Sequence, residues 1–232
     1  MEVPNGNKHR GQLCFYEGLG TALLLISVNL GALGSRQAID VTGLADPEQG
    51  MAALAGLADR AKELEKMKEE QIRQAVSQQI TAVGYGIWTY ILFLSPMCGG
   101  HVNPAVTLAV LIKCGRRDLA ENAKSALAIM LSQFLGGFLG CLLVYVCINW
   151  DEPVQHSIAI LGPGEAATYG RVFVAEMIGT FIFASLIISV KFHNGAKDGA
   201  VNCFLVGMCL YAVLFMVGGV SGGAINPAVG LC

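Results

Sequence analysis

Uncharged apolar stretches alternate with short charged segments along this chain, and they predict where helices cross a membrane. Residues 18–35, 74–112, 125–150 and 199–232 contain no Asp, Glu, Lys or Arg, and residues 172–190 contain one, Glu176. One crossing of a bilayer takes about 20 mostly apolar residues. We therefore predict an integral membrane protein with five spans, at residues 13–33, 76–95, 125–149, 172–190 and 201–217.

Two of the uncharged stretches, 74–112 and 199–232, are too long for one span, and each contains the tripeptide Asn-Pro-Ala. Proline is favoured in the first turn of a helix, where its missing N–H costs nothing, so each motif predicts a helix that begins at its Asn. Irregular backbone is tolerated at membrane depth only where protein buries it or water lines it. We expect each motif to begin a re-entrant half-helix, and both to line one polar path. The motifs are Asn103, Pro104 and Ala105 in the first copy and Asn226, Pro227 and Ala228 in the second.

The two motifs belong to a longer internal repeat. Residues 98–106 nearly match residues 221–229, 123 positions later, and Glu-x-x-Gly-Thr occurs at 17–21 and again at 176–180, 159 positions later. Repeat units with an odd number of spans insert in opposite orientations, which predicts an inverted repeat about an axis in the membrane plane. We read residues 1–232 as one domain, with a first repeat at 12–149 and a truncated second repeat at 170–232.

The first repeat is 36 residues longer than the second between its first two spans, and this excess is the charged insertion at residues 36–73. Its first part is rich in Asp, Gly and Pro, which predicts a loop. From about Met51, apolar residues at three-four spacing and pairs of Glu with Lys or Arg predict a helix that continues into the second span. We interpret this helical insertion as a solvated or intersubunit cap in preference to a ligand site.

Charge predicts an orientation, and composition predicts no cofactor. Outside the insertion, eight Lys and Arg residues fall on the side of the N-terminus, counting Lys191 in the loop after the fourth span, and one, Arg171, falls on the other side. The positive-inside rule then places the N-terminus in the cytoplasm, although the insertion narrows the difference to eight against seven. The eight Cys residues show no metal-ligand spacing, so we expect packing roles for them and no metal site. No cofactor and no nucleic-acid partner is expected.

The paired Asn-Pro-Ala motifs, the two Glu-x-x-Gly-Thr segments and the Gln-Phe-Leu-Gly-Gly sequence at 133–137 resemble the aquaporin, or major intrinsic protein, family. The resemblance covers nearly all of the chain except residues 36–73. It implies an all-α membrane protein, an inverted-repeat bundle of transmembrane helices with two re-entrant half-helices that meet at mid-membrane. It also implies one pore per subunit, a homotetramer in the lipid bilayer, and passive conduction of water and small neutral solutes without enzymatic activity.

The resemblance assigns roles to particular residues of the pore. Asn103 and Asn226 would form the central filter, with backbone carbonyls of about 99–102 and 222–225 as a ladder of acceptors. Four positions would form an outer filter: Val83, Leu214, Gly223 and Val229. Water-selective members usually carry aromatic and His side chains at the first two positions and Arg at the last, whereas the glycerol branch usually carries Asp where this chain has Gly230. We therefore predict an atypical, apolar outer filter and name no preferred solute.

Three further features of the sequence leave alternatives open. Glu17 and Glu176 lie within apolar spans, where a carboxylate is either a proton relay or a structural acceptor for re-entrant backbone N–H groups, and the family precedent favours the second. His101 is either a gating group or an anchor for its loop. The repeat also predicts a sixth span of about 20 residues that is absent from this chain, because the sequence is a truncated record or because the chain is a five-span isoform.

The leading hypothesis of a passive channel has two competitors. A secondary transporter would also suit an inverted repeat, but the chain offers no cluster of ion-coupling carboxylates. A non-conducting structural membrane protein would use the charged insertion as an adhesive surface. No set of nucleophile and base, phosphate loop or metal cluster points to an enzyme.

Overall fold

The computed structural model describes residues 7–40, 57–114, 118–148, 167–193 and 195–232, and these residues form helices without any strand. Five helices are long and apolar enough to cross a membrane, as predicted from the uncharged stretches. Two shorter helices follow the Asn-Pro-Ala motifs. In chain order the helices are α1 (Asn7–Asp40), α2 (Leu57–Cys98), α3 (Pro104–Cys114), α4 (Leu119–Ile148), α6 (Tyr169–Phe192), α7 (Gly199–Ser221) and α8 (Pro227–Leu231).

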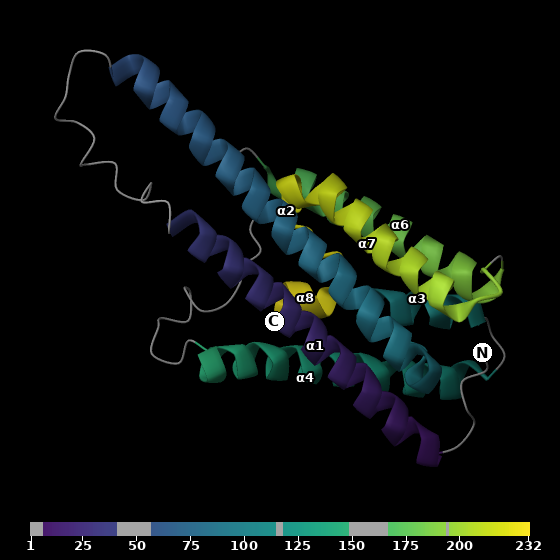
Figure 1. Cartoon of the computed structure of the whole chain (residues 1–232). Helices are drawn as coiled ribbons and strands as arrows, with labels where there is room; N and C mark the ends of the chain where they lie inside the picture. The colour runs from purple at the N-terminus through teal and green to yellow at the C-terminus, as the bar shows by residue number, and fades with distance from the viewer. Residues whose placement is uncertain (1–6, 41–56, 115–117, 149–166, 194) are drawn as a thin grey trace.

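Each predicted span lies within one of the long helices, apart from residue 149 at the end of the third span, which lies outside the described residues. The start of the insertion differs from the prediction. Residues 36–40 continue α1 and do not form a loop, since no Gly or Pro follows Gly34 before residue 43 to end the helix. The remaining predicted loop and the predicted helix start at Met51 lie outside the described residues. From Leu57 the chain runs as one helix to Cys98, as predicted, and the N-terminal part of α2 extends beyond the bundle (Figure 1).

The long helices pack in two groups that share α2. α1 lies against α2 and α4, whereas α7 lies against α2 and α6 (Figure 1). Glycines permit the close crossings: a Cβ atom on Gly140 of α4 would fall 2.5 Å from the Ala22 carbonyl oxygen of α1, and one on Gly207 of α7 would fall 3.1 Å from the Gly84 carbonyl oxygen of α2. Small residues are favoured at such crossings because they let backbones approach.

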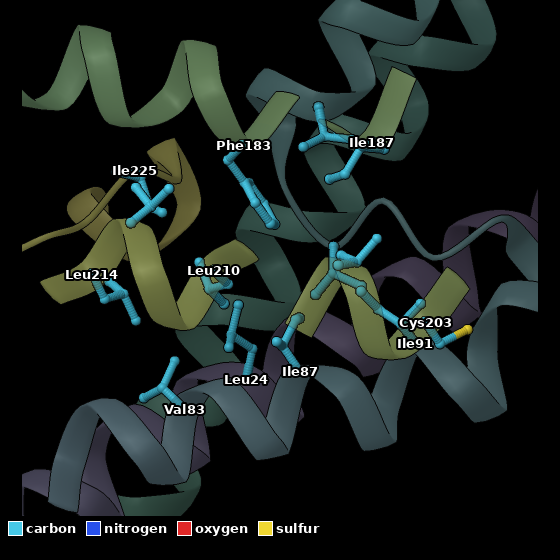
Figure 2. Packing of buried hydrophobic residues seen from close by; sticks show 14 of the residues in the cluster. Leu24, Val83, Ile87, Ile91, Phe183, Ile187, Cys203, Leu210, Leu214 and Ile225 are labelled. Atoms are coloured by element: carbon cyan, nitrogen blue, oxygen red, sulfur yellow. The ribbon is translucent and has the colours of Figure 1, made fainter. Parts of the chain in front are cut away.

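Buried apolar side chains from α1, α2, α6 and α7 converge on the centre of the bundle. Figure 2 shows Val83 and Ile87 of α2 on one side of this cluster, and Leu210 and Leu214 of α7 opposite them. Large apolar residues also cover the outward faces, for example Leu135 on α4 and Phe181 on α6, each 71% exposed. An apolar outer face suits lipid contact, since lipid tails are as apolar as these side chains.

Candidate functional site

The two Asn-Pro-Ala motifs begin α3 and α8 in the same way. The Oδ1 atom of Asn103 accepts a 2.8 Å hydrogen bond from the N–H of Ala105, and the Oδ1 atom of Asn226 accepts a 3.0 Å hydrogen bond from the N–H of Ala228. Each Asn is therefore an N-cap that satisfies a free N–H of the first turn. The prolines occupy the first helical position, where no N–H is needed.

The two caps are also joined to each other. The Asn103 Nδ2 atom donates to the carbonyl oxygen of Ile225 at 3.0 Å, and the Asn226 Nδ2 atom donates to that of Val102 at 2.9 Å. The half-helices thus meet at their N-terminal ends, with both Asn side chains buried. A primary amide has two N–H donors, so each Asn keeps a second N–H after this exchange.

The residue before each Asn holds a strained backbone. Val102 has φ 51° and Ile225 has φ 35°, and both side chains are almost fully buried. A β-branched residue with positive φ is a genuine outlier, at a cost on the order of 1–3 kcal/mol. The surrounding contacts must therefore hold these two positions in place.

Glu17 supplies those contacts for the first re-entrant loop. Its Oε1 atom accepts from the N–H of His101 at 2.8 Å and its Oε2 atom accepts from the N–H of Val102 at 2.7 Å. Gln133 of α4 donates to the same Oε2 atom at 2.9 Å. The carboxylate is fully buried, and three charge-assisted hydrogen bonds compensate for its desolvation.

Glu176 makes the equivalent contacts in the second loop. It accepts from the N–H of Ala224 at 3.1 Å and from that of Ile225 at 2.6 Å, and the Ser221 hydroxyl donates to it at 2.5 Å. Ala224 and Ile225 correspond to His101 and Val102 in the repeat. Both carboxylates therefore have the contacts that the structural alternative requires, and their functional role stays a prediction.

The central and outer filter positions lie around one cavity. A cavity of about 330 Å³ is lined by both Asn residues and by all four predicted outer-filter residues, together with apolar side chains of α1, α2 and α7. Gly223 leaves space there, since a Cβ atom at this position would come within 3.0 Å of Leu214 Cδ2. The outer-filter positions offer no side-chain donor. Their role as a filter stays a prediction, but the structure brings them together.

A second cavity, of about 450 Å³, lies on the other side of the first re-entrant loop. His101 and Ile91 line both cavities, so these two residues mark the place where the cavities adjoin. The His101 ring Nδ1 lies 3.2 Å from the Thr107 hydroxyl, and the backbone N–H of His101 donates a hydrogen bond to Glu17. These contacts suit an anchor, while the position between two cavities keeps the gating alternative open.

Lys191 is a residue that the sequence reasoning placed wrongly. It lies in the last turn of α6 and not in the following loop, and its Nζ atom donates to the Gly99 carbonyl oxygen at 2.5 Å, in the wall of the second cavity. The apolar run ends at Val190, so the charge was taken as the end of the span. In the predicted acceptor ladder, the carbonyls of Gly99, Val102 and Ile225 each accept one hydrogen bond from a protein group, which leaves one lone pair on each oxygen, and the ladder stays a prediction.

Gln133 is a residue of the site to which the sequence alone assigned no role. Besides Glu17, it contacts the Thr107 hydroxyl of α3 at 3.1 Å, so it ties α4 to the half-helix. A buried amide in an otherwise apolar span is the signal that could have found it.

Among the described residues, no group of three or more His, Cys, Asp or Glu side chains could hold a metal ion.

Comparisons with known proteins agree on one family. Residues 9–232 match the family described as Major intrinsic protein. The chain is 28% identical to the "Probable aquaporin AqpM" of Archaeoglobus fulgidus, over 77% of this chain and 64% of that protein. It is 30% identical to the "Probable glycerol uptake facilitator protein" of Thermotoga maritima, over 64% of this chain and 62% of that protein. The chain thus spans less than two thirds of the length of these curated relatives.

A solved structure has the same fold. The X-ray structure of the aquaglyceroporin from Plasmodium falciparum aligns with a TM-score of 0.66 at 20% sequence identity, covering 96% of this chain and 78% of that one. At this level of identity the match describes the architecture alone.

Proposed function

The chain belongs to the major intrinsic protein family, and from this membership and the joined half-helices we propose that it is a passive channel for water and small neutral solutes. The protein is integral to the membrane. The family consists of channels and not of enzymes. The observation that carries the proposal is the cavity that both Asn side chains and the four outer-filter residues line together.

Permeation would follow from hydrogen bonding without a covalent step. Asn103 and Asn226 each have one amide N–H left for a passing oxygen, at the point where the half-helices meet. The carbonyls of Gly100 and His101 and of Gly222, Gly223 and Ala224 would accept from the same molecule on either side. Fixed donors and acceptors along a narrow lane orient neutral molecules in single file and oppose the passage of ions.

The outer filter of this channel would be apolar. Val83 and Leu214 are buried in the core cluster, and Val229 packs against it. None of them offers a donor or a fixed charge, so this constriction would not select by charge or hydrogen bonding. The cytoplasmic N-terminus, the homotetramer, the domain division at 12–149 and 170–232, and the cap role of residues 36–73 belong to the same proposal.

The test is a flux measurement on the full chain in proteoliposomes. Light scattering after gradients of water, glycerol, urea and ammonia should show faster relaxation than protein-free liposomes, with rates that rise in proportion to the gradient and need no ion gradient. Saturation at low solute, or dependence on an ion gradient, would favour the secondary transporter. Liposomes packed with folded protein but no more permeable than empty ones would favour a non-conducting structural role.

A further inference from the structure

The two cavities differ in charge, and one residue makes the difference. Among the described residues that line them, Lys191 in the second cavity is the one Lys, Arg, Asp or Glu side chain. The residues of the predicted outer filter in the first cavity, Val83, Leu214 and Val229, carry no charge. A permeating molecule would therefore meet a fixed side-chain charge in only one half of its path.

The internal repeat shows that this charge breaks the symmetry of the pathway. Position 32 precedes Lys191 by 159 residues, which is also the spacing of Glu17 and Glu176. Ala32 lines the first cavity as Lys191 lines the second. The two residues thus occupy matching places at opposite ends, one small and apolar and the other cationic.

The surroundings of Lys191 fix its ammonium group beside the path. Its Nζ atom donates to the Gly99 carbonyl oxygen at 2.5 Å, two residues before the N–H groups that Glu17 holds. Burial disfavours the charged form of Lys191, and the Glu17 carboxylate on the other side of this loop favours it. An ammonium has three N–H donors, and the Gly99 contact uses one. Lys191 is half-buried and lines the second cavity.

We propose that Lys191 is the charge filter of this channel. Its ammonium group repels cations within the second cavity, which is a function that the uncharged Val229 cannot supply at the predicted outer filter. Charges interact strongly in a narrow cavity with apolar walls, and such a cavity focuses the field of a single group on the ions that enter it. This inference rests on the proposed channel function.

The competing explanation is that Lys191 only holds Gly99 in place. In that case a neutral donor of suitable length would replace it without consequence for ions, and loss of the contact would disturb the re-entrant loop and neutral flux together. The Lys191→Gln variant separates the two explanations because it keeps a donor but removes the charge. Lys191→Met removes both the donor and the charge. Lys191→Arg keeps the donor and the charge, because a guanidinium stays charged. Lys197→Gln is the matched control, since Lys197 is exposed six residues further along the chain.

The experiment measures neutral flux by light scattering and ammonium and potassium conductance in planar bilayers for the wild type and each variant. We expect the wild type, K191R and K197Q to conduct neutral solutes and to carry no cation current above that of a protein-free bilayer. K191Q and K191M should keep neutral flux and gain about tenfold or more in cation conductance.

Some results would overturn this inference and leave the proposed channel in place. One is that K191Q and K191M conduct neutral solutes and stay as impermeable to cations as the wild type. Another is that neutral flux falls in K191M and is restored in K191Q without any cation current. A wild type that folds and carries no neutral solute would overturn the proposed function and this inference with it. A wild type that already conducts cations as well as K191Q would overturn the charge filter and leave the channel in place.

Discussion

The backbone of Gly136 in α4 lies against Gly18 in α1 so closely that a Cβ atom on Gly136 would fall 2.0 Å from the Gly18 carbonyl oxygen. Gly136→Ala must therefore push the two helices apart. We expect this substitution to lower the free energy of unfolding by about 1–3 kcal/mol, as overpacking of a well-filled site does. Thermal unfolding of the detergent-solubilised protein measures the loss.

Gly219→Ala is the control for this prediction. Gly219 is an exposed residue in α7, and a Cβ atom there meets nothing within 4 Å. Alanine should be tolerated or should stabilise the helix slightly, by up to ~1 kcal/mol. Equal stability of the two variants would show that α1 and α4 do not cross at Gly18 and Gly136.

Local features of the sequence were sufficient to predict the helices and the half-helix starts. Uncharged runs of sufficient length predict spans wherever they occur, and Asn followed by Pro predicts a helix start from backbone chemistry alone. The end of α1 was predicted too early, because a change to polar residues after Gly34 was taken as the end of the helix, although no residue there stops helical hydrogen bonding.

Contacts between segments that lie far apart along the chain could not be predicted from the sequence. Gln133 meets Glu17 only because α4 crosses α1, and Lys191 meets Gly99 only because α6 ends beside the re-entrant loop. The repeat could place Ala32 and Lys191 at matching positions, but it could not show that both side chains line a cavity. The local pattern of the sequence predicts the helices, whereas the cavities depend on how these helices cross one another.

Glu17→Gln should destabilise the protein through its backbone contacts. A glutamine has one acceptor oxygen, so its amide N–H2 would face an N–H donor of His101, Val102 or Gln133 and leave it unpaired. An unsatisfied buried donor costs about 1–3 kcal/mol. We expect a lower unfolding temperature and a matching fall in water flux, whereas Glu121→Gln, an exposed residue on α4, should leave the flux unchanged.

This pair of measurements also decides between the two roles of the carboxylate. A proton relay would leave the unfolding temperature of Glu17→Gln unchanged and remove only a proton-dependent flux. A variant that is as stable as the wild type, with such a selective loss, would contradict the structural role.

Asn103→Asp should disconnect the half-helices while keeping the cap. The carboxylate can still accept from the N–H of Ala105, but it cannot donate to the Ile225 carbonyl and repels that oxygen. We expect a fall of at least about 1 kcal/mol in stability and a strong loss of water flux. Ser125→Ala, whose hydroxyl donates to the Glu121 carbonyl within α4, serves as a buried control. Wild-type flux in Asn103→Asp would show that the central donors are not needed for permeation.

Val229→Arg tests whether position 229 lies at the outer constriction. The side chain would extend into the cavity of about 330 Å³ that Val83 and Leu214 also line, and it would add a fixed charge and donors where the wild type has neither. We expect water flux to persist and glycerol and urea flux to fall by about tenfold or more, because a narrower polar constriction favours the smallest solute. Val76→Arg adds the same charge at an exposed position in the wall of the same cavity, and it should leave the solute profile unchanged. If Val229→Arg gives the profile of the wild type, the outer filter lies elsewhere, and the apolar character of Val229 has no bearing on selectivity.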